Sequence, residues 1–279
     1  MFVSEPSVLD RLRGGSPLNV MLQTGVLTSM LPAITPELGA AIEGLYKAFA
    51  GYPLPEHMPG CPCCHSVDAD RPLHSRPLRK LREEELREYS NDALLTWGDL
   101  DQFRHFLPRI FELAVIGDEI SFVDRPIVFE KLYHGEWRYW PEPEQKAVEQ
   151  FLMALWRAVI EDPPEDIPPQ ERYYPCNTVE EWLCALAQAV DLSPYLDEWL
   201  RASSAAAAWN LAAIITRTGM VLAQPQGISA FWSGHMDQAE QVSNWLHSEP
   251  VRKKLESAIE TFAAEPFAEE LMAAWSMVT

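Results

Sequence analysis

Apolar side chains recur at the three- and four-residue spacing of an α-helix along most of the chain. The clearest series spans residues 141–160, with apolar positions at Val148, Phe151, Leu152, Leu155, Trp156 and Val159. Such a series forms one face of a helix, and that face must be buried against a neighbouring element. The alternating pattern of a half-buried strand is present only weakly, at residues 119–123. The chain is therefore expected to be all-α.

Capping residues and prolines indicate where the helices begin and end. Ser16-Pro17 reads as an N-cap followed by proline at the first helical position, and Thr35-Pro36-Glu37 opens the next helix. Asp99 can cap a later helix, which Pro108 should kink or split. We expect helices at residues 18–31, 35–49, 83–97, 100–113, 125–133, 141–160, 178–190, 193–202, 205–223, 236–246, 250–263 and 266–278. Short helices joined by short turns favour an irregular multi-helix bundle or a HEAT-like stack of helical pairs, although no strict repeat period is found.

Residues 161–177 are rich in proline and acidic side chains, which is typical of a linker. They would separate an N-terminal helical subdomain, residues 1–160, from a C-terminal helical subdomain, residues 178–279. The alternative is one continuous domain. Residues 51–77 form a long segment without periodicity inside the first subdomain, and loops of this length are often functional.

The charge balance narrows the range of partners. The chain carries 41 acidic and 22 basic residues, for a formal net charge of -19 at pH 7. Such a surface repels nucleic acids and anionic membranes and attracts basic proteins. The alternative is that the charge serves solubility alone. The most apolar stretch, residues 205–223, is interrupted by Arg217 and no targeting segment is recognised, so we expect a soluble protein in the cytoplasm, where thiols stay reduced.

Three thiols and an imidazole are concentrated in the segment Gly60-Cys61-Pro62-Cys63-Cys64-His65. Cys61 and Cys64 have the C-x-x-C spacing that lets two thiolates bind one zinc ion. The candidate ligands are Cys61, Cys63, Cys64, His65 and His74, with His57, Cys176 and Cys184 as further candidates to complete the site. No second C-x-x-C or H-x-x-x-H motif completes a standard zinc site.

Other interpretations of this segment stay open. The cysteines can pack as small apolar side chains in a loop held by prolines, or they can act as redox-sensing thiols of lowered pKa. Cys61, Cys64 and His65 also match the C-x-x-C-H pattern of haem attachment, but that chemistry requires export, for which no signal is recognised. Cys184 lies on the apolar side of its predicted helix and is expected in the core.

Two weaker groups complete the set of candidate residues. Asp101, His105 and Arg109 are spaced to share one helix face if Pro108 does not break the helix, and they form either a polar site or an ordinary solvated face. Aromatic residues accompany an arginine in loop-like segments, which is typical of partner-binding surfaces, although they can instead fill gaps between helices. The residues of this expected surface are Trp137, Arg138, Tyr139, Trp140 and Trp232.

The Cys-Pro-Cys-Cys segment at 61–64, Thr-Trp-Gly-Asp at 96–99 and the stretch His105-Phe106-Leu107-Pro108-Arg109-Ile110-Phe111-Glu112-Leu113 resemble those of a group of bacterial helical proteins without an assigned activity. The resemblance extends to residues 265–270. It implies a bacterial, cytosolic, helical protein and carries over no catalytic residue.

Two functions from different classes follow from these patterns. The first is an acidic helical protein that binds a basic protein partner, for example an immunity- or antitoxin-like protein. The alternative is a zinc- or thiol-dependent enzyme centred on Cys61–His65. Because no motif for a catalytic nucleophile, a phosphate loop or a dinucleotide site is recognised, the sequence favours the first function.

Overall fold

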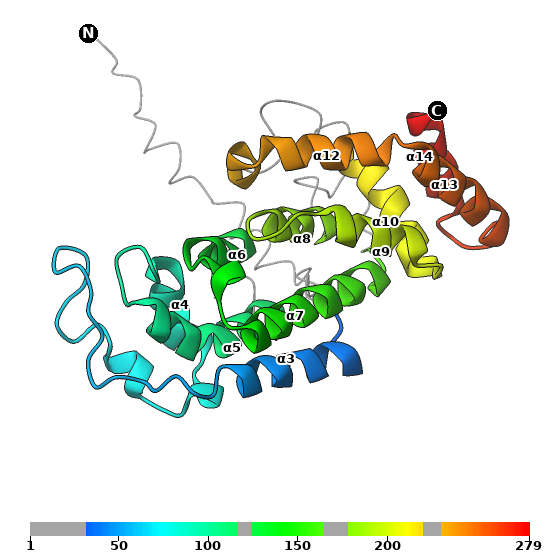
Figure 1. The fold of residues 1–279 in the computed structure, drawn as a ribbon. Helices are drawn as coiled ribbons and strands as arrows, with labels where there is room; N and C mark the ends of the chain where they lie inside the picture. Colours follow the sequence, from blue (N-terminus) through cyan, green and yellow to red (C-terminus); the bar gives the residue numbers. More distant parts are fainter. Residues whose placement is uncertain (1–31, 117–123, 165–177, 220–229) are drawn as a thin grey trace, which may run out of the picture. The chain divides into compact units, whose positions relative to one another are not determined.

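The computed structural model describes residues 32–116, 124–164, 178–219 and 230–279. These residues contain 11 α-helices and no strand, which confirms the all-α prediction for this part of the chain (Figure 1). The helices are α3 (Pro36–Ala48), α4 (Glu83–Asp92), α5 (Leu100–Ile116), α6 (Arg125–His134), α7 (Glu142–Glu161), α8 (Thr178–Ala187), α9 (Ser193–Arg201), α10 (Ala205–Ile214), α12 (Met236–Leu246), α13 (Glu249–Thr261) and α14 (Ala268–Val278).

Some predicted elements lie outside the described residues. These are the helix at 18–31, the weak strand at 119–123, most of the linker at 161–177 and the end of the helix at 205–223. Among the residues that are described, none of the helices has both the length and the apolar character that a membrane crossing requires.

Helix α7 lies at the centre of the packing. It contacts α3, α8, α9 and α10, so helices from both sides of the predicted linker pack against one another. The described residues all belong to one compact unit. The fully buried Trp156 of α7 donates from Nε1 to the carbonyl oxygen of Tyr195 in α9 at 2.7 Å, and its ring meets Trp199 edge-on with centroids 5.5 Å apart. These contacts join α7 to α9 through both apolar burial and a directed hydrogen bond.

Two predicted helix starts carry side-chain caps, of which only the one at Asp99 was expected; the cap expected at Ser16 lies outside the described residues. Thr35 Oγ1 accepts the backbone N–H of Leu38 at 3.1 Å. Asp99 and Gln102 cap each other: Asp99 Oδ1 accepts the N–H of Gln102 at 3.0 Å, and Gln102 Oε1 accepts the N–H of Asp99 at 2.9 Å. This reciprocal arrangement satisfies two backbone donors at the start of α5.

Pro108 does not split α5, which runs as one helix from Leu100 to Ile116. A proline inside a helix lacks the N–H for one backbone hydrogen bond. The side chains around it are deeply buried, Leu107 and Phe111 at 0% exposure and Ile110 at 1%. Apolar packing on both sides of the proline therefore holds the helix together at this position, which the local sequence signal does not reveal.

Glu270, in the first turn of α14, ties this helix to the end of α10 and the π-helical turn Ile215–Gly219. Its carboxylate accepts hydrogen bonds from Trp209 Nε1 at 2.9 Å, Thr216 Oγ1 at 2.9 Å and Arg217 Nε at 3.0 Å. Burial alone would raise the pKa of Glu270, but the hydrogen bonds from Arg217 and Trp209 outweigh burial and lower it. The ionised carboxylate is therefore the form that stabilises this junction.

Glu270→Ala should lower the free energy of unfolding by about 2–3 kcal/mol at neutral pH, because it removes the hydrogen bonds that Trp209, Thr216 and Arg217 donate to this carboxylate at a largely buried junction. Glu269→Ala, an exposed neighbour on the same turn, should change it by less than about 0.5 kcal/mol. Because the folded-state pKa of Glu270 is depressed, its contribution is present above the unfolded pKa of about 4.3 and is lost as pH falls through the folded value. Urea unfolding at neutral and acidic pH measures both effects; equal losses in the two variants would contradict this assignment.

Candidate metal centre

The three neighbouring cysteines lie on one tight turn of the segment 51–77. The backbone N–H groups of Cys64 and His65 both donate to the carbonyl oxygen of Cys61 at 2.9 Å, which closes the turn around Cys61–His65. Pro62 fixes one backbone dihedral inside this turn. The turn is anchored from outside, since the N–H of Cys61 donates to the carbonyl oxygen of Thr96 at 2.8 Å.

The anchoring segment, residues 93–98, is where sequence and structure differ most clearly. A helix was expected at 83–97, but α4 ends at Asp92, whose carbonyl oxygen accepts the N–H groups of Leu95, Thr96 and Trp97 at 3.0–3.1 Å. Leu94 adopts a left-handed conformation with φ 64°, which interrupts the helix. The chain thereby folds back, and Trp97 forms an isolated β-bridge with Gly60 in front of the cysteine turn.

Close packing connects the turn to the hydrophobic core. The His65 ring stacks on Trp97 with centroids 4.5 Å apart, and Trp97 meets the buried Tyr89 edge-on at 5.6 Å. A side chain at Gly60 would place its Cβ 3.3 Å from both His65 Cδ2 and Trp97 Cδ1. Glycine at this position therefore lets the turn approach the tryptophan closely.

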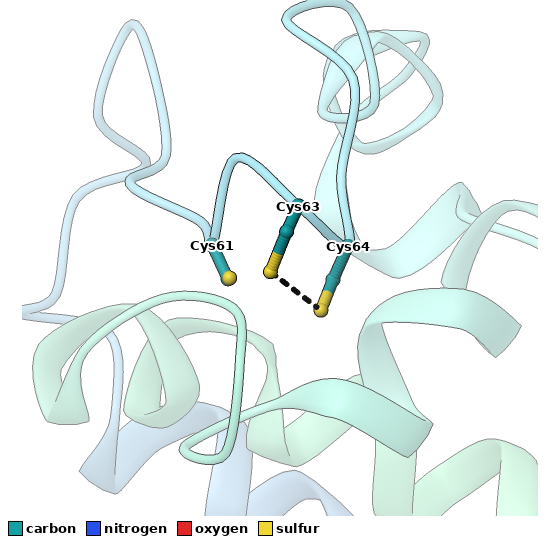
Figure 2. Close-up of side chains that lie close together, drawn as sticks. All are labelled: Cys61, Cys63 and Cys64. Atoms are coloured by element: carbon teal, nitrogen blue, oxygen red, sulfur yellow. Dashed lines mark hydrogen bonds between the residues drawn. The ribbon is translucent and has the colours of Figure 1, made fainter.

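The sulfurs of Cys61, Cys63 and Cys64 all lie within 4.8 Å of one another. Figure 2 shows the three side chains projecting from the turn on the same side. The Sγ atoms of Cys63 and Cys64 are 3.6 Å apart. Cys63 and Cys64 are exposed and Cys61 is half-buried, so the cluster is open to an incoming ion.

The local hydrogen bonds favour ionisation of one thiol first. The Cys63 side chain and the backbone N–H groups of Cys63 and Cys64 lower the pKa of Cys61. The pKa of Cys64 is raised to about 11, chiefly because its thiol donates to Cys63 and Cys61. The turn therefore stabilises a thiolate at Cys61, and a bound cation would replace the remaining thiol protons.

The donor set fits a thiophilic metal ion. Bonds of about 2.3 Å from zinc to sulfur place two sulfurs about 3.8 Å apart in tetrahedral geometry and about 4.0 Å apart in trigonal geometry. The 3.6 Å between the sulfurs of Cys63 and Cys64 lies close to these spacings, and the sulfur of Cys61 is within 4.8 Å of both. A disulfide between the two adjacent cysteines fits less well, because neighbouring Cα atoms are only about 3.8 Å apart.

The predicted histidine ligands do not join the sulfur cluster. His65 Nδ1 lies 3.3 Å from Glu88 Oε1, and Nε2 lies 3.1 Å from Thr96 Oγ1 and 3.6 Å from Asp92 Oδ2. His74 and His57 both face Asp70, at 3.9 and 3.6 Å. His65, Glu88 and Asp92 form a second group of ligand atoms within 4.8 Å of one another.

The remaining cysteines do not add a ligand from the described residues. Cys184 is 1% exposed on α8, where burial raises the pKa of its thiol, as expected of a core cysteine. Cys176 lies outside the described residues. The described residues thus provide a three-sulfur group and an adjacent nitrogen–oxygen group, each of which could hold a metal ion.

Asp101, His105 and Arg109 share α5 but have separate partners. Asp101 is paired with Arg104 at 3.5 Å. His105 Nδ1 faces the carbonyl oxygen of Tyr52 at 2.7 Å, and burial lowers the pKa of this histidine. Arg109 donates from Nε to the carbonyl oxygen of Leu81 and from Nη1 to a carboxylate on its own helix, each at 2.7 Å. These contacts are those of side chains that tie α5 to surrounding loops.

The aromatic residues expected at a partner-binding surface divide into two kinds. Trp137, Trp140 and Trp232 are 2, 3 and 1% exposed. These three residues were expected at an exposed binding surface, but they are buried. Each indole N–H has a partner inside the protein; that of Trp140, for example, donates to the carbonyl oxygen of Gly135 at 2.7 Å. Only Tyr139, 86% exposed, and the neighbouring Arg138 remain at the surface.

Sequence reasoning missed Glu88, Asp92 and Thr96 as neighbours of the cysteine turn. Glu88 and Asp92 are spaced i, i+4 and so share a face of α4. This spacing is common on solvated helices, and only the fold-back after Asp92 brings them to His65.

No protein-family model matches the chain, and comparisons with curated proteins and with solved structures give no significant match.

Proposed function

We propose that this protein binds a thiophilic metal ion, with zinc as the first candidate, through Cys61, Cys63 and Cys64. The observation that carries the proposal is the convergence of three sulfurs within 4.8 Å on one side of an anchored turn. Thiolates are the ligands that zinc and other soft ions prefer.

The ligand count supports a site for binding or exchange. Structural zinc sites are usually closed by four protein ligands, whereas sites that act on a further ligand have three and an open position. Among the described residues, the turn offers three sulfurs, and His65 faces Glu88 and Thr96 instead. The turn is also held by backbone hydrogen bonds and by its contact with Trp97. An open fourth position would serve a zinc-dependent reaction or the transfer of the ion to another thiol.

Elemental analysis of the full-length protein, purified without chelator and then equilibrated with zinc by dialysis, tests the proposal. We expect a zinc content that falls by about one ion per chain in the variant Cys61→Ser/Cys63→Ser/Cys64→Ser, because a serine hydroxyl is a poor zinc ligand. Cys184→Ala is the matched control: it removes a thiol from the core and should leave the zinc content unchanged. Equal zinc contents of the wild-type protein and the triple variant would contradict the proposal.

The charge surplus supports a second candidate function, the binding of a basic protein. The net charge is -19, and several surface arginines are already neutralised internally: Arg79 by Glu43 at 2.6 Å, and Arg157 by Glu37 and Glu198, each at 2.6 Å. The unmatched surface charge is therefore negative. Quantitative mass spectrometry of proteins retained by the immobilised chain should show basic proteins that are released as salt rises, since exposed charges are screened. Retention without a bias towards basic proteins would contradict this function.

A further inference from the structure

His65, Glu88 and Asp92 form a compact group of nitrogen and oxygen donors beside the cysteine turn. Their ligand atoms lie within 4.8 Å of one another. The imidazole side chain is 4% exposed, whereas the side chains of Glu88 and Asp92 are 65% and 37% exposed. A nearly buried imidazole is thus flanked by two carboxylates that a cation can reach from solvent.

The spacing of these atoms resembles a metal site more closely than a set of ion pairs. Charge-assisted hydrogen bonds between nitrogen and carboxylate oxygen are about 2.7–2.9 Å long. His65 Nδ1 and Glu88 Oε1 are 3.3 Å apart, whereas Asp92 Oδ2 is nearest to the other ring nitrogen, 3.6 Å from Nε2, and one ion binds only one of the two nitrogens. Two ligands of one tetrahedral ion with bonds of about 2.1 Å lie about 3.4 Å from each other. A cation bound beside one nitrogen would leave the other nitrogen to donate its N–H to a neighbouring oxygen.

Such an outer contact is present. With the ion on Nδ1, beside Glu88, Nε2 can donate its N–H to Thr96 Oγ1 at 3.1 Å, and the ring packs against Trp97. Hydrogen bonds and packing of this kind orient histidines that bind metals. The charge of this group matches that of a divalent cation. A neutral imidazole and two carboxylates together carry two negative charges, which one divalent cation balances.

We infer that His65, Glu88 and Asp92 bind a second, divalent cation of the borderline class, such as Mn²⁺, Co²⁺ or Zn²⁺, next to the three-thiol site. Imidazole and carboxylate ligands suit these ions, and thiolates suit softer ones. Because His65 directly follows Cys64, one turn would present two sites of different chemistry. This second site does not require the thiol site to be occupied.

The test uses the full chain carrying Cys61→Ser/Cys63→Ser/Cys64→Ser, in which the thiol site is absent. Titration with Mn²⁺, followed by loss of the electron paramagnetic resonance signal of the free ion, should show one saturable site per chain. Titration with Co²⁺ should give ligand-field absorption without sulfur-to-cobalt charge transfer. In the same background, Glu88→Gln and Asp92→Asn should each weaken Mn²⁺ binding by about 100-fold or more, since removal of outer contacts alone costs about 10–100-fold.

Glu84→Gln is the control, because Glu84 lies on the same helix but pairs with Arg82 at 2.9 Å. It should leave Mn²⁺ binding unchanged. Circular dichroism of each variant confirms that the helices are retained. Absence of saturable binding in the serine background, or equal affinities in the Glu84, Glu88 and Asp92 variants, would overturn the inference. Either result would leave the three-thiol proposal standing, because that site is tested by the zinc content of the wild-type chain.

Discussion

Removal of zinc by a chelator should lower the melting temperature of the zinc-saturated protein by roughly 5–10 °C. A ligand present at about 100 times its dissociation constant stabilises the folded state by about 2.7 kcal/mol. For a folded unit of about 150–250 residues, each kcal/mol shifts the melting temperature by about 2–4 °C. Differential scanning calorimetry with and without chelator measures the shift.

Most of the shift should depend on the cysteine turn. In Cys61→Ser/Cys63→Ser/Cys64→Ser the response to the chelator should be much smaller, limited to zinc bound at His65, Glu88 and Asp92, and because two of the three side chains are exposed, the variant should still fold. Cys184→Ala should melt at a lower temperature because Cys184 is buried, yet it should keep the full response to the chelator. An unchanged response in the triple variant would assign the stabilisation to another site.

Trp156→Ala should lower the free energy of unfolding by about 3–5 kcal/mol, the usual loss for deletion of a large buried ring. The ring is 0% exposed at the centre of the packing, it contacts Trp199, and its Nε1 donates to the carbonyl oxygen of Tyr195. The substitution would leave both a cavity and a carbonyl group without this donor. Chemical denaturation followed by circular dichroism measures the loss.

Tyr139→Ala is the control for this substitution. Tyr139 is also an aromatic residue, but it is 86% exposed, so its removal should change stability by less than about 0.5 kcal/mol. A loss below about 1 kcal/mol for Trp156→Ala would contradict the central position of α7 in the core.

The helices that could be predicted are those whose signals are local. The segment expected at 141–160 is observed as α7, Glu142–Glu161, because its apolar spacing and its acidic first turn act within the helix itself. The helix start at Thr35 and the cap at Asp99 could be predicted for the same reason.

The end of α4 could not be predicted in this way. The sequence around Leu94 continues the helical pattern, and nothing in it marks a left-handed residue. The fold-back is held by contacts with Gly60 and Cys61, which are distant in sequence. Tertiary contacts also decide the position of Trp137, Trp140 and Trp232, whose loop-like sequence context suggested exposure although all three rings are buried.

The same distinction applies to the candidate site. The three cysteines are close in sequence, so their convergence followed from the turn itself. The partners of His65 could not be predicted from the sequence, because Glu88 and Asp92 reach it only through the fold-back after α4. His74 was an expected ligand by proximity in sequence, but it faces Asp70 instead.

X-ray absorption at the zinc edge of the protein loaded with one equivalent of zinc tests the central claim most directly. If the cysteine turn binds the ion, the spectrum will show a sulfur shell at about 2.3 Å with an occupancy of about three, and this shell will be lost in Cys61→Ser/Cys63→Ser/Cys64→Ser. A first shell made only of nitrogen and oxygen at about 2.0–2.1 Å would show that zinc is bound elsewhere and that the three sulfurs are not its ligands.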